Sequence, residues 1–255
     1  MIDQEMKETI CDIHCHILPG IDDGSRNWDM TLQMVQQSWD AGVRTMIATP
    51  HYLPWHERLK GETVLSLVEE ARQKVASELG VEMTILAGEE LYYHSGLMEE
   101  LQQGKALTMA GSRYILLEFA EDASYSEIRM AVQRFQRSPW KPIIAHVERY
   151  GALRKKQHLE EILSMGAQLQ SNAEEMQRRI FDSTRRWLRK CYDARFISYI
   201  GSDAHDVTER PPLSEASLKW FRDNIDNEYR AQLFGGERSL RTDICQKSEL
   251  CYIKG

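Results

Sequence analysis

The chain has 255 residues, 42% of them hydrophobic, which allows one large α/β domain with a core of its own. Its net charge of -7 argues against a nucleic-acid partner, since phosphate backbones are bound by clustered positive charge, and no stretch approaches the roughly 20 apolar residues of a membrane span. The polar N-terminus (residues 1–9) is not typical of a secretory signal, and five irregularly spaced cysteines fit a reducing compartment, so we expect a cytoplasmic protein.

Short apolar runs rich in β-forming residues alternate with helical segments along the whole chain. The predicted strands occupy Thr9–Ile17, Val43–Thr49, Val81–Ala87, Arg113–Phe119, Pro142–Ala145, Ala167–Gln170 and Phe196–Ile200. Strands that alternate with helices are typical of a parallel sheet. Because no linker rich in proline, glycine or serine interrupts the series, we predict one barrel-like α/β domain over residues 1–255.

Apolar residues three or four positions apart predict the helices between these strands. In the first helix they are Trp28, Leu32, Val35 and Trp39. We expect Ser25 to cap this helix and Gly42 to follow its end. Further helices are expected at Val64–Val75, Ile128–Phe135, Leu159–Leu163 and Tyr229–Phe234. The residues from about 236 onward are polar and poorly patterned, and no structure is assigned to them.

Residues that bind metals well lie at the ends of the apolar runs. His14 and His16 are two apart on a predicted strand, so both imidazoles point the same way and can hold one ion, while Cys15 points away and packs. Alone, such a pair is more typical of solvent-facing histidines. Asp203 and His205 repeat the spacing, although an aspartate here could equally cap a helix. A barrel brings its strand ends to one rim, so two pairs together favour a metal site.

Other metal-binding residues follow further runs. Glu118 is informative by itself, because a carboxylate at the end of a buried run is costly unless it is paired or metal-bound. For His51 and His146 the ordinary alternative is a hydrogen-bonded histidine at the rim. Glu89 and Glu90 are adjacent and must face different ways, and their spacing does not decide which one is a ligand. Together these residues predict a hydrolase with several metal ions.

The assembled motifs resemble the polymerase and histidinol phosphatase family of metal-dependent phosphoesterases, and most closely the bacterial tyrosine-protein phosphatases of capsule and exopolysaccharide gene clusters. Six blocks carry the resemblance in the family's order: Asp12–Gly24, Ala41–His51, Gly88–Tyr93, Tyr114–Phe119, Ile144–Tyr150 and Ser202–Pro212. A single His-x-His motif would be weak support, but six ordered blocks are specific. The loop Tyr52–Lys60 and the C-terminal tail have no match in the family pattern.

The resemblance implies a distorted TIM-like barrel of about seven parallel strands with outer helices, and a site for three divalent metal ions. On the family pattern the first ion is held by His14, His16, Glu90 and Asp203, the second by Glu90, Glu118 and His146, and the third by Asp23, His51 and His205. The family's bridging glutamate directly precedes an aliphatic residue, which selects Glu90 over Glu89. From spacing alone, residues 22–24 are a turn with a helix cap. Ligands without thiolates suit Mn, with Fe or Zn as alternatives.

The implied activity is hydrolysis of phosphotyrosine by a hydroxide that bridges metal ions, without a phosphoenzyme. Arg149 and Arg210 match the family's phosphate-binding arginines. If the leaving group needs a proton, our hypothesis is that His51 or His205 passes it through water. The implied partner is a phosphotyrosine protein, specifically a bacterial tyrosine autokinase in capsule or exopolysaccharide control. The sequence predicts no particular oligomeric state.

Three alternatives compete with this interpretation. A histidinol-phosphate phosphatase or another small-molecule phosphomonoesterase would share the metal site, but the Asp22–Gly24 turn and the blocks around Arg149 and Arg210 favour the protein phosphatase. A non-catalytic regulator that binds a kinase tail would be expected to lack some of the nine ligands, and none is missing. An amidohydrolase would be expected to carry a bridging lysine at a strand end, and no suitable lysine is visible in the sequence.

Overall fold

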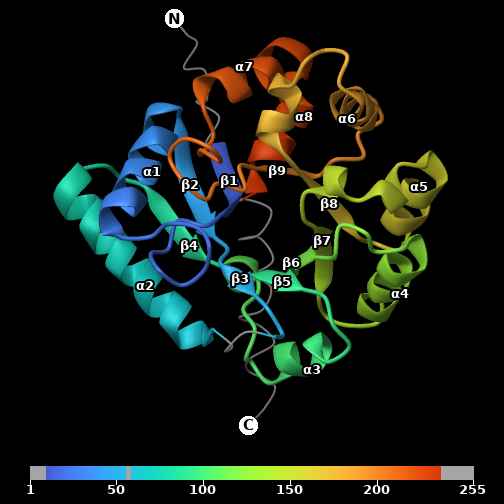
Figure 1. Cartoon of the computed structure of the whole chain (residues 1–255), viewed down its shortest axis with the longest axis horizontal. Helices are drawn as coiled ribbons and strands as arrows, with labels where there is room; N and C mark the ends of the chain where they lie inside the picture. The colour runs from blue at the N-terminus through green and yellow to red at the C-terminus, as the bar shows by residue number, and fades with distance from the viewer. Residues whose placement is uncertain (1–9, 56–58, 237–255) are drawn as a thin grey trace, which may run out of the picture.

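Parallel strands lie at the centre of the structure and helices surround them (Figure 1). The computed structural model describes residues 10–55 and 59–236. The strands are β1 (Ile10–Cys15), β2 (Val43–Ala48), β3 (His51–Tyr52), β4 (Thr84–Ala87), β5 (Glu90–Tyr92), β6 (Tyr114–Glu118), β7 (Lys141–Ile144), β8 (Gln168–Asn172) and β9 (Tyr199–Gly201). They form a three-stranded sheet in the order β1-β2-β4 and a six-stranded sheet in the order β3-β5-β6-β7-β8-β9. The α/β class with parallel strands is therefore confirmed.

The two sheets are continuous along the chain, because β3 follows β2 and β5 follows β4 after short interruptions. Only Thr49 and Pro50 separate β2 from β3, and only Gly88 and Glu89 separate β4 from β5, while β2 pairs with β4 and β3 with β5. Pro50 has no N–H to donate, so the regular ladder is interrupted there. The N–H of Glu90 still donates to the carbonyl of Pro50 at 3.0 Å. The sequence predicted one strand in each of these places, and neither β3 nor β5 was expected.

The first and last strands also lie side by side. The N–H of His16 donates to the carbonyl of Ala204 at 2.8 Å, and the N–H of Asp203 donates to the carbonyl of His14 at 2.7 Å. These bonds join the end of β1 to the segment directly after β9. Two histidines and an aspartate of the predicted metal site are thereby held next to one another through their own backbone.

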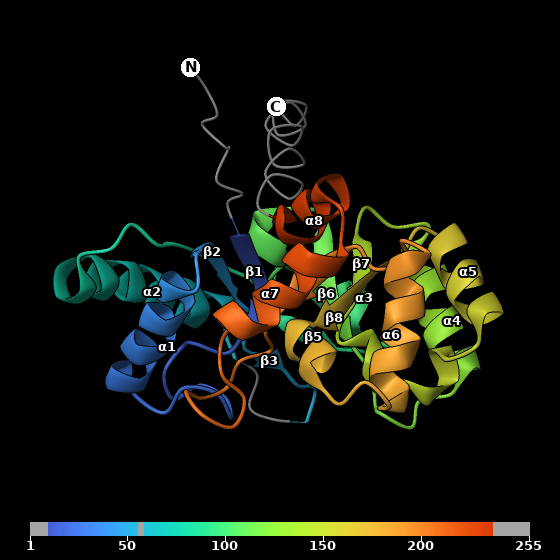
Figure 2. The same cartoon turned by 90° about the horizontal axis from the view of Figure 1, so that it is seen from above.

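The helices lie outside the strands (Figure 2). They are α1 (Trp28–Asp40), α2 (Gly61–Lys74), α3 (Leu97–Gln102), α4 (Tyr125–Phe135), α5 (Lys156–Ser164), α6 (Ser183–Asp193), α7 (Glu215–Asn224) and α8 (Asn227–Phe234). The five predicted helices are present, whereas α3, α6 and α7 were not predicted. None of the described helices is both long and apolar enough to cross a membrane. The predicted strand start at Thr9, residues 56–58 of the unmatched loop and the tail at 237–255 lie outside the described residues.

Two sequence predictions about the start of α1 are wrong. Asn27, not Ser25, caps the helix, because its side-chain oxygen accepts the N–H of Met30 at 3.0 Å. The hydroxyl of Ser25 is instead buried, 2.9 Å from that of Thr31. Asp22 caps no helix either. It forms the expected turn by accepting the N–H of Gly24 at 3.0 Å, and its second oxygen faces the metal-binding residues.

The core lies on both faces of the strands. In β6, Ile115 and Leu117 belong to a large cluster that includes apolar residues of the helices, whereas Tyr114 and Leu116 belong to a smaller cluster made almost entirely of strand residues. Side chains alternate between the two faces of a strand, so the large cluster lies between strands and helices and the small one on the face away from the helices. Both faces are packed below the end of the strands that carries the site.

Substitutions on α4 test this packing. Replacing Ile128, which is fully buried in the large cluster, with alanine is expected to lower the free energy of unfolding by about 2–5 kcal/mol. The matched control is Met130→Ala on the same helix, where the side chain is 54% exposed and little should change. Urea denaturation followed by circular dichroism measures both variants, and equal losses for the two would contradict the assigned helix face.

Candidate metal centre

All nine side chains implied as metal ligands lie together at one end of the strands. They are located in or directly after β1 (His14, His16), in the loop before α1 (Asp23), in β3 (His51), in β5 (Glu90), at the end of β6 (Glu118), two residues after β7 (His146) and two and four residues after β9 (Asp203, His205). No two of these segments except β1 and its loop are close in sequence. The fold therefore gathers residues that are spread over most of the chain.

Their donor atoms form three overlapping groups, and within each group the atoms lie within 4.8 Å of one another. The groups are His14, His16, Glu90 and Asp203; His16, Asp23, His51 and His205; and His51, Glu90 and Glu118. The first group contains the four residues implied for the first ion, and all four are buried. His146 contacts the third group, since its Nε2 lies 2.7 Å from Oε1 of Glu90 and 3.7 Å from Oε1 of Glu118.

Glu90 occupies the middle of the cluster, and Glu89 points away from it. The Oε2 atom of Glu90 lies 3.3 Å from Nε2 of His14 and 3.0 Å from Nδ1 of His51. Glu89 instead accepts the N–H of Leu107 at 2.7 Å, and burial raises its pKa to about 8. The two adjacent carboxylates thus face different ways, as their spacing predicted, and Glu90 is the one in the cluster, as the resemblance implied.

Three histidines are held so that Nε2 faces the cluster. Nδ1 of His14 lies 3.1 Å from Oε1 of Gln170, and Nδ1 of His16 lies 2.8 Å from Oδ2 of Asp22. Nδ1 of His205 lies 2.9 Å from the carbonyl oxygen of Asp203. Each partner atom is an acceptor, so each Nδ1 carries the proton and each Nε2 offers a lone pair when the ring is neutral. This arrangement is typical of histidine ligands of metal ions.

Gln170 and Asn172 extend this support across the site, and the sequence reasoning missed both. Oε1 of Gln170 accepts the backbone N–H of His146 at 2.7 Å, so its amide nitrogen must be the donor to Oδ1 of Asn172 at 2.9 Å. The amide nitrogen of Asn172 then donates to Oδ2 of Asp203 at 3.0 Å. One chain of hydrogen bonds therefore orients His14 in β1, His146 after β7 and Asp203 after β9. The signal in the sequence was that every second residue of β8 is a polar amide, although the strand is largely buried.

Two glycines let the chain pass close to the first two histidines. A Cβ on Gly24 would lie 2.3 Å from the carbonyl oxygen of His16, and a Cβ on Gly201 would lie 2.6 Å from Cβ of His14. Neither position has room for any larger side chain. These contacts fix the loop before α1 and the end of β9 against β1.

Arg149 and Arg210 meet at Asp203. Both guanidinium groups contact Oδ2 of Asp203, Arg210 through Nη2 at 2.8 Å, while Oδ1 lies 3.5 Å from Nε2 of both His14 and His16. Asp203 has a left-handed backbone conformation with φ of 56° and caps no helix, which removes the alternative interpretation of this residue. The arginine side chains are 31% and 36% exposed, so they border the opening of the site.

The cluster fits divalent cations on the chemistry of its donor atoms. Four buried atoms have no hydrogen-bond partner among residues 10–55 and 59–236: Nδ1 of His51, Oε2 of Glu90, Oδ1 of Asp203 and Nε2 of His205. Buried polar atoms without partners are rare, and here they converge on one place. Imidazole and carboxylate ligands without a thiolate suit Mn, Fe or Zn.

Charge in the cluster is balanced only in part. Burial would lower the pKa of both His16 and His51, but Asp22 raises the pKa of His16 to about 9 and Asp23 raises that of His51 to about 11. Burial, together with the neighbouring Glu90, raises the pKa of Glu118 to about 7. Without a bound cation, His16 and His51 are therefore protonated near neutral pH, and their positive charge offsets that of the carboxylates.

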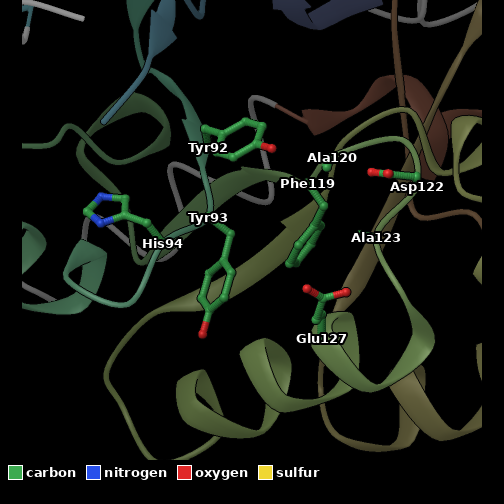
Figure 3. Close-up of a pocket in the computed structure, with 8 residues that line it drawn as sticks. All are labelled: Tyr92, Tyr93, His94, Phe119, Ala120, Asp122, Ala123 and Glu127. Atoms are coloured by element: carbon green, nitrogen blue, oxygen red, sulfur yellow. The ribbon is translucent and has the colours of Figure 1, made fainter. Parts of the chain in front are cut away.

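An aromatic pocket lies beside the ends of β5 and β6 (Figure 3). It has a volume of about 370 Å³, and its lining includes Tyr92, Tyr93, Phe119 and the carboxylates of Asp122 and Glu127. Tyr93 and Phe119 point to the same side, toward α4, with ring centroids 5.4 Å apart. Tyr92 is paired with Glu118 between β5 and β6, and Phe119 directly follows Glu118. The pocket therefore begins one residue from the cluster.

Comparison with known proteins gives the family. Residues 10–239 match the family model described as capsular polysaccharide synthesis, CpsB/CapC. The chain belongs to the CpsB/CapC family. Tyrosine-protein phosphatase CpsB of Streptococcus agalactiae serotype V is 29% identical over 238 residues, covering 88% of this chain and 94% of the relative. The resemblance to capsule-cluster phosphatases is thus confirmed.

Solved structures confirm the kind of fold. One comes from work on YwqE from Bacillus subtilis and CpsB from Streptococcus pneumoniae, described as metal-dependent tyrosine phosphatases; it matches with a TM-score of 0.84 at 24% identity, covering 92% of this chain and 95% of the other. An amidohydrolase from Mycoplasma synoviae matches with a TM-score of 0.58 at 12% identity, covering 89% and 86%. The fold of this chain therefore resembles that of this amidohydrolase.

The hydrogen-bond chain through Gln170 gives a prediction for metal affinity. Gln170→Leu removes the acceptor of His14 and the donor to Asn172, so we expect the dissociation constant for Mn²⁺ to rise about 10-fold to 100-fold. Gln133→Leu, at an exposed position on α4, is the control. Titration of metal-free protein with Mn²⁺ measures the constant, and unchanged affinity in Gln170→Leu would show that the amide does not support the site.

Protons should leave when a cation binds. With pKa values of about 9 and 11, His16 and His51 are protonated near neutral pH without metal, and a metal ligand must be a neutral imidazole. We therefore expect net proton release on Mn²⁺ binding, and an affinity that rises as the pH rises from neutral toward the pKa of His16. Isothermal titration in buffers of different ionisation enthalpy measures the released protons. A binding enthalpy that is the same in every buffer would contradict this charge balance.

Proposed function

We propose that this chain is a metal-dependent protein-tyrosine phosphatase. The observation that carries the proposal is that two arginines and an aromatic pocket adjoin one cluster of nine metal-binding side chains, most of them buried. Membership of the CpsB/CapC family supports it, as do curated relatives named as tyrosine-protein phosphatases. Within this proposal the nine residues hold three divalent ions, with Mn as the first candidate and Fe or Zn as alternatives.

The proposed ligand assignment follows the resemblance, with two adjustments that the donor groups favour. His16 is close enough to serve beside Asp23, His51 and His205, and His51 is close enough to serve beside Glu90 and Glu118. When bound, such ions supply Lewis acidity that lowers the pKa of water and offsets charge on phosphate oxygens. The protein fixes the ligand orientations and leaves its opening near Asp23, which is 66% exposed.

The arginines are proposed to bind the phosphate group. Asp203 holds the guanidinium groups of Arg149 and Arg210 at the opening, where their remaining N–H groups can donate to non-bridging oxygens. Both guanidinium groups are therefore oriented before a phosphate group binds. Tyrosine's phenol has a pKa of about 10, so it leaves as an anion more easily than an alkoxide and depends less on an acid. His51 or His205 is proposed to pass a proton to it through water.

The aromatic pocket is the proposed binding place of the tyrosine side chain. Tyr92, Tyr93 and Phe119 offer ring faces and edges directly beside Glu118. Trp55, which is 60% exposed, extends this surface from the unmatched loop, with its ring centroid 4.5 Å from that of Tyr92. An aromatic phosphoester fits these walls better than an aliphatic one.

The proposal extends to the number of strands in the barrel, the substrate and the cellular location. If β2 is counted with β3 and β4 with β5, seven strands form the distorted barrel of one domain over residues 1–255. The proposed substrate is a phosphotyrosine protein, a bacterial tyrosine autokinase in capsule or exopolysaccharide control, and the proposed location is the cytoplasm. The family description and the relatives' names support the connection with capsule synthesis.

Metal-dependent hydrolysis of a phosphotyrosine peptide tests the function. We expect EDTA to abolish it, Mn²⁺ to restore it and His14→Ala to lower kcat by at least about 100-fold, since several kcal/mol of charge stabilisation are lost. His158→Ala is the matched control, because His158 stacks on Tyr125 at 3.6 Å outside the cluster and should keep full activity. Phosphate release measures both variants.

The same assay separates the alternatives. Faster hydrolysis of histidinol phosphate than of the peptide would reassign the protein to small-molecule phosphatases. A failure to hydrolyse either substrate with Mn²⁺, Fe²⁺ or Zn²⁺ would contradict the catalytic proposal and leave a binding role.

A further inference from the structure

A cationic segment, residues 178–190, lies beside the cluster and has no part in the proposed reaction. It holds six basic side chains and one acidic one, in a chain whose net charge is -7. The basic residues are Arg178, Arg179, Arg185, Arg186, Arg189 and Lys190. Such a concentration of positive charge runs against the composition of the rest of the chain.

The segment belongs to the same rim as the arginines of the site. Asn172, which contacts Asp203, ends β8, and a short turn leads from it to Arg178. Nη2 of Arg154 donates to the carbonyl of Glu148 at 2.6 Å and to the hydroxyl of Thr184 at 3.1 Å. Glu148 directly precedes Arg149, so one side chain connects the first turn of α6 to the phosphate-binding arginine. The rest of α6 extends along the outside of the molecule (Figure 2).

Some of these basic side chains contact neighbouring groups of the chain, and others are exposed to solvent. Arg178 pairs with Glu175 at 2.7 Å, and Nη1 of Arg185 donates to the carbonyl of Arg178 at 2.5 Å. Asp182, the acidic residue, accepts the N–H groups at the start of α6 and so serves as its cap. Arg179 and Arg186 are exposed, and neither side chain has an ion pair or hydrogen bond within residues 10–55 and 59–236.

Two large apolar side chains lie in the middle of the charged ones. Ile180 is 63% exposed and Phe181 is 80% exposed. Phe181 lines a shallow cavity of about 510 Å³ together with Arg178, Arg179 and Asp182. Exposed aromatic and arginine side chains in one patch are typical of the residues that dominate protein interfaces.

We infer that residues 178–190 dock an acidic stretch of the phosphoprotein substrate beside its phosphotyrosine; this rests on the proposed function. Charge complementarity selects the occupant, because the overall negative charge repels an acidic segment elsewhere and attraction is concentrated here. Arg179 and Arg186 contact the acidic side chains, and Phe181 contacts an apolar residue among them. The aromatic pocket begins beside Glu118, so the phosphotyrosine ring enters there and the acidic flanking residues lie along residues 178–190.

Binding of two matched peptides tests this inference without requiring turnover. Each carries the same central non-hydrolysable phosphotyrosine analogue, flanked by glutamates in one peptide and by lysines in the other. Fluorescence anisotropy at low salt should show the acidic peptide binding at least about tenfold more tightly, with the difference shrinking at high salt. Arg179→Glu/Arg186→Glu should remove the preference, and Phe181→Ser should weaken binding of the acidic peptide by about threefold to tenfold.

The control is Arg137→Glu, an exposed arginine before β7 and thus at the other end of the strands, which should keep the preference. Equal affinity for the two peptides, or a preference that survives Arg179→Glu/Arg186→Glu, would overturn the inference. So would co-sedimentation of the protein with anionic but not neutral vesicles that depends on the same arginines, which would assign the segment to a membrane surface. Hydrolysis of ordinary p-nitrophenyl phosphate with Mn²⁺, measured in parallel, reports on the proposed function separately.

Discussion

The burial of Glu90 is the constraint on which the rest of the site depends. Its carboxylate is fully buried among imidazoles from three different segments, with His14, His51 and His146 all within 3.3 Å. A buried charge costs several kcal/mol unless oppositely charged or hydrogen-bonding groups surround it. Those groups come from β1, β3 and the end of β7, so the carboxylate is compensated only when the strands are arranged side by side. Formation of the site and correct arrangement of the strands therefore depend on each other.

Around that carboxylate, polar side chains orient the metal-binding residues. Asp22, Gln170 and Asn172 contact no substrate in our proposal. Asp22 and Gln170 determine which nitrogen of His16 and His14 faces the cluster, and Asn172 determines where Asp203 points. Asp203 in turn holds both arginines. A phosphate group would therefore meet ligands and guanidinium groups whose positions are already fixed, which reduces the reorganisation that accompanies binding.

Much of this arrangement was predictable from the sequence, for reasons visible in particular residues. The seven apolar runs and the residues at their ends are local patterns, and they gave the parallel strands and the candidate ligands other than Asp23, which came only from the resemblance. The helix α6 was missed because six basic residues in and before it hide its few apolar positions, and β5 because it is three residues long.

Other features depend on contacts that a linear pattern does not contain. Ser25 and Asn27 are both good caps, and only the path of the loop decides between them. Gln170 looks like an ordinary strand residue until His14 and His146 are placed on either side of it. The assignment of Glu90 over Glu89 came from the resemblance, and its physical basis is the hydrogen bond that turns Glu89 toward Leu107.

The most direct test of the central claim is a crystal structure of the Mn²⁺-loaded protein with anomalous diffraction recorded at the manganese edge. The account predicts three anomalous peaks, each among the donor atoms of one of the three groups around Glu90, and none elsewhere at comparable height. Peaks that lie outside the cluster, or a cluster without any peak at saturating Mn²⁺, Fe²⁺ or Zn²⁺ with each metal recorded at its own absorption edge, would contradict it.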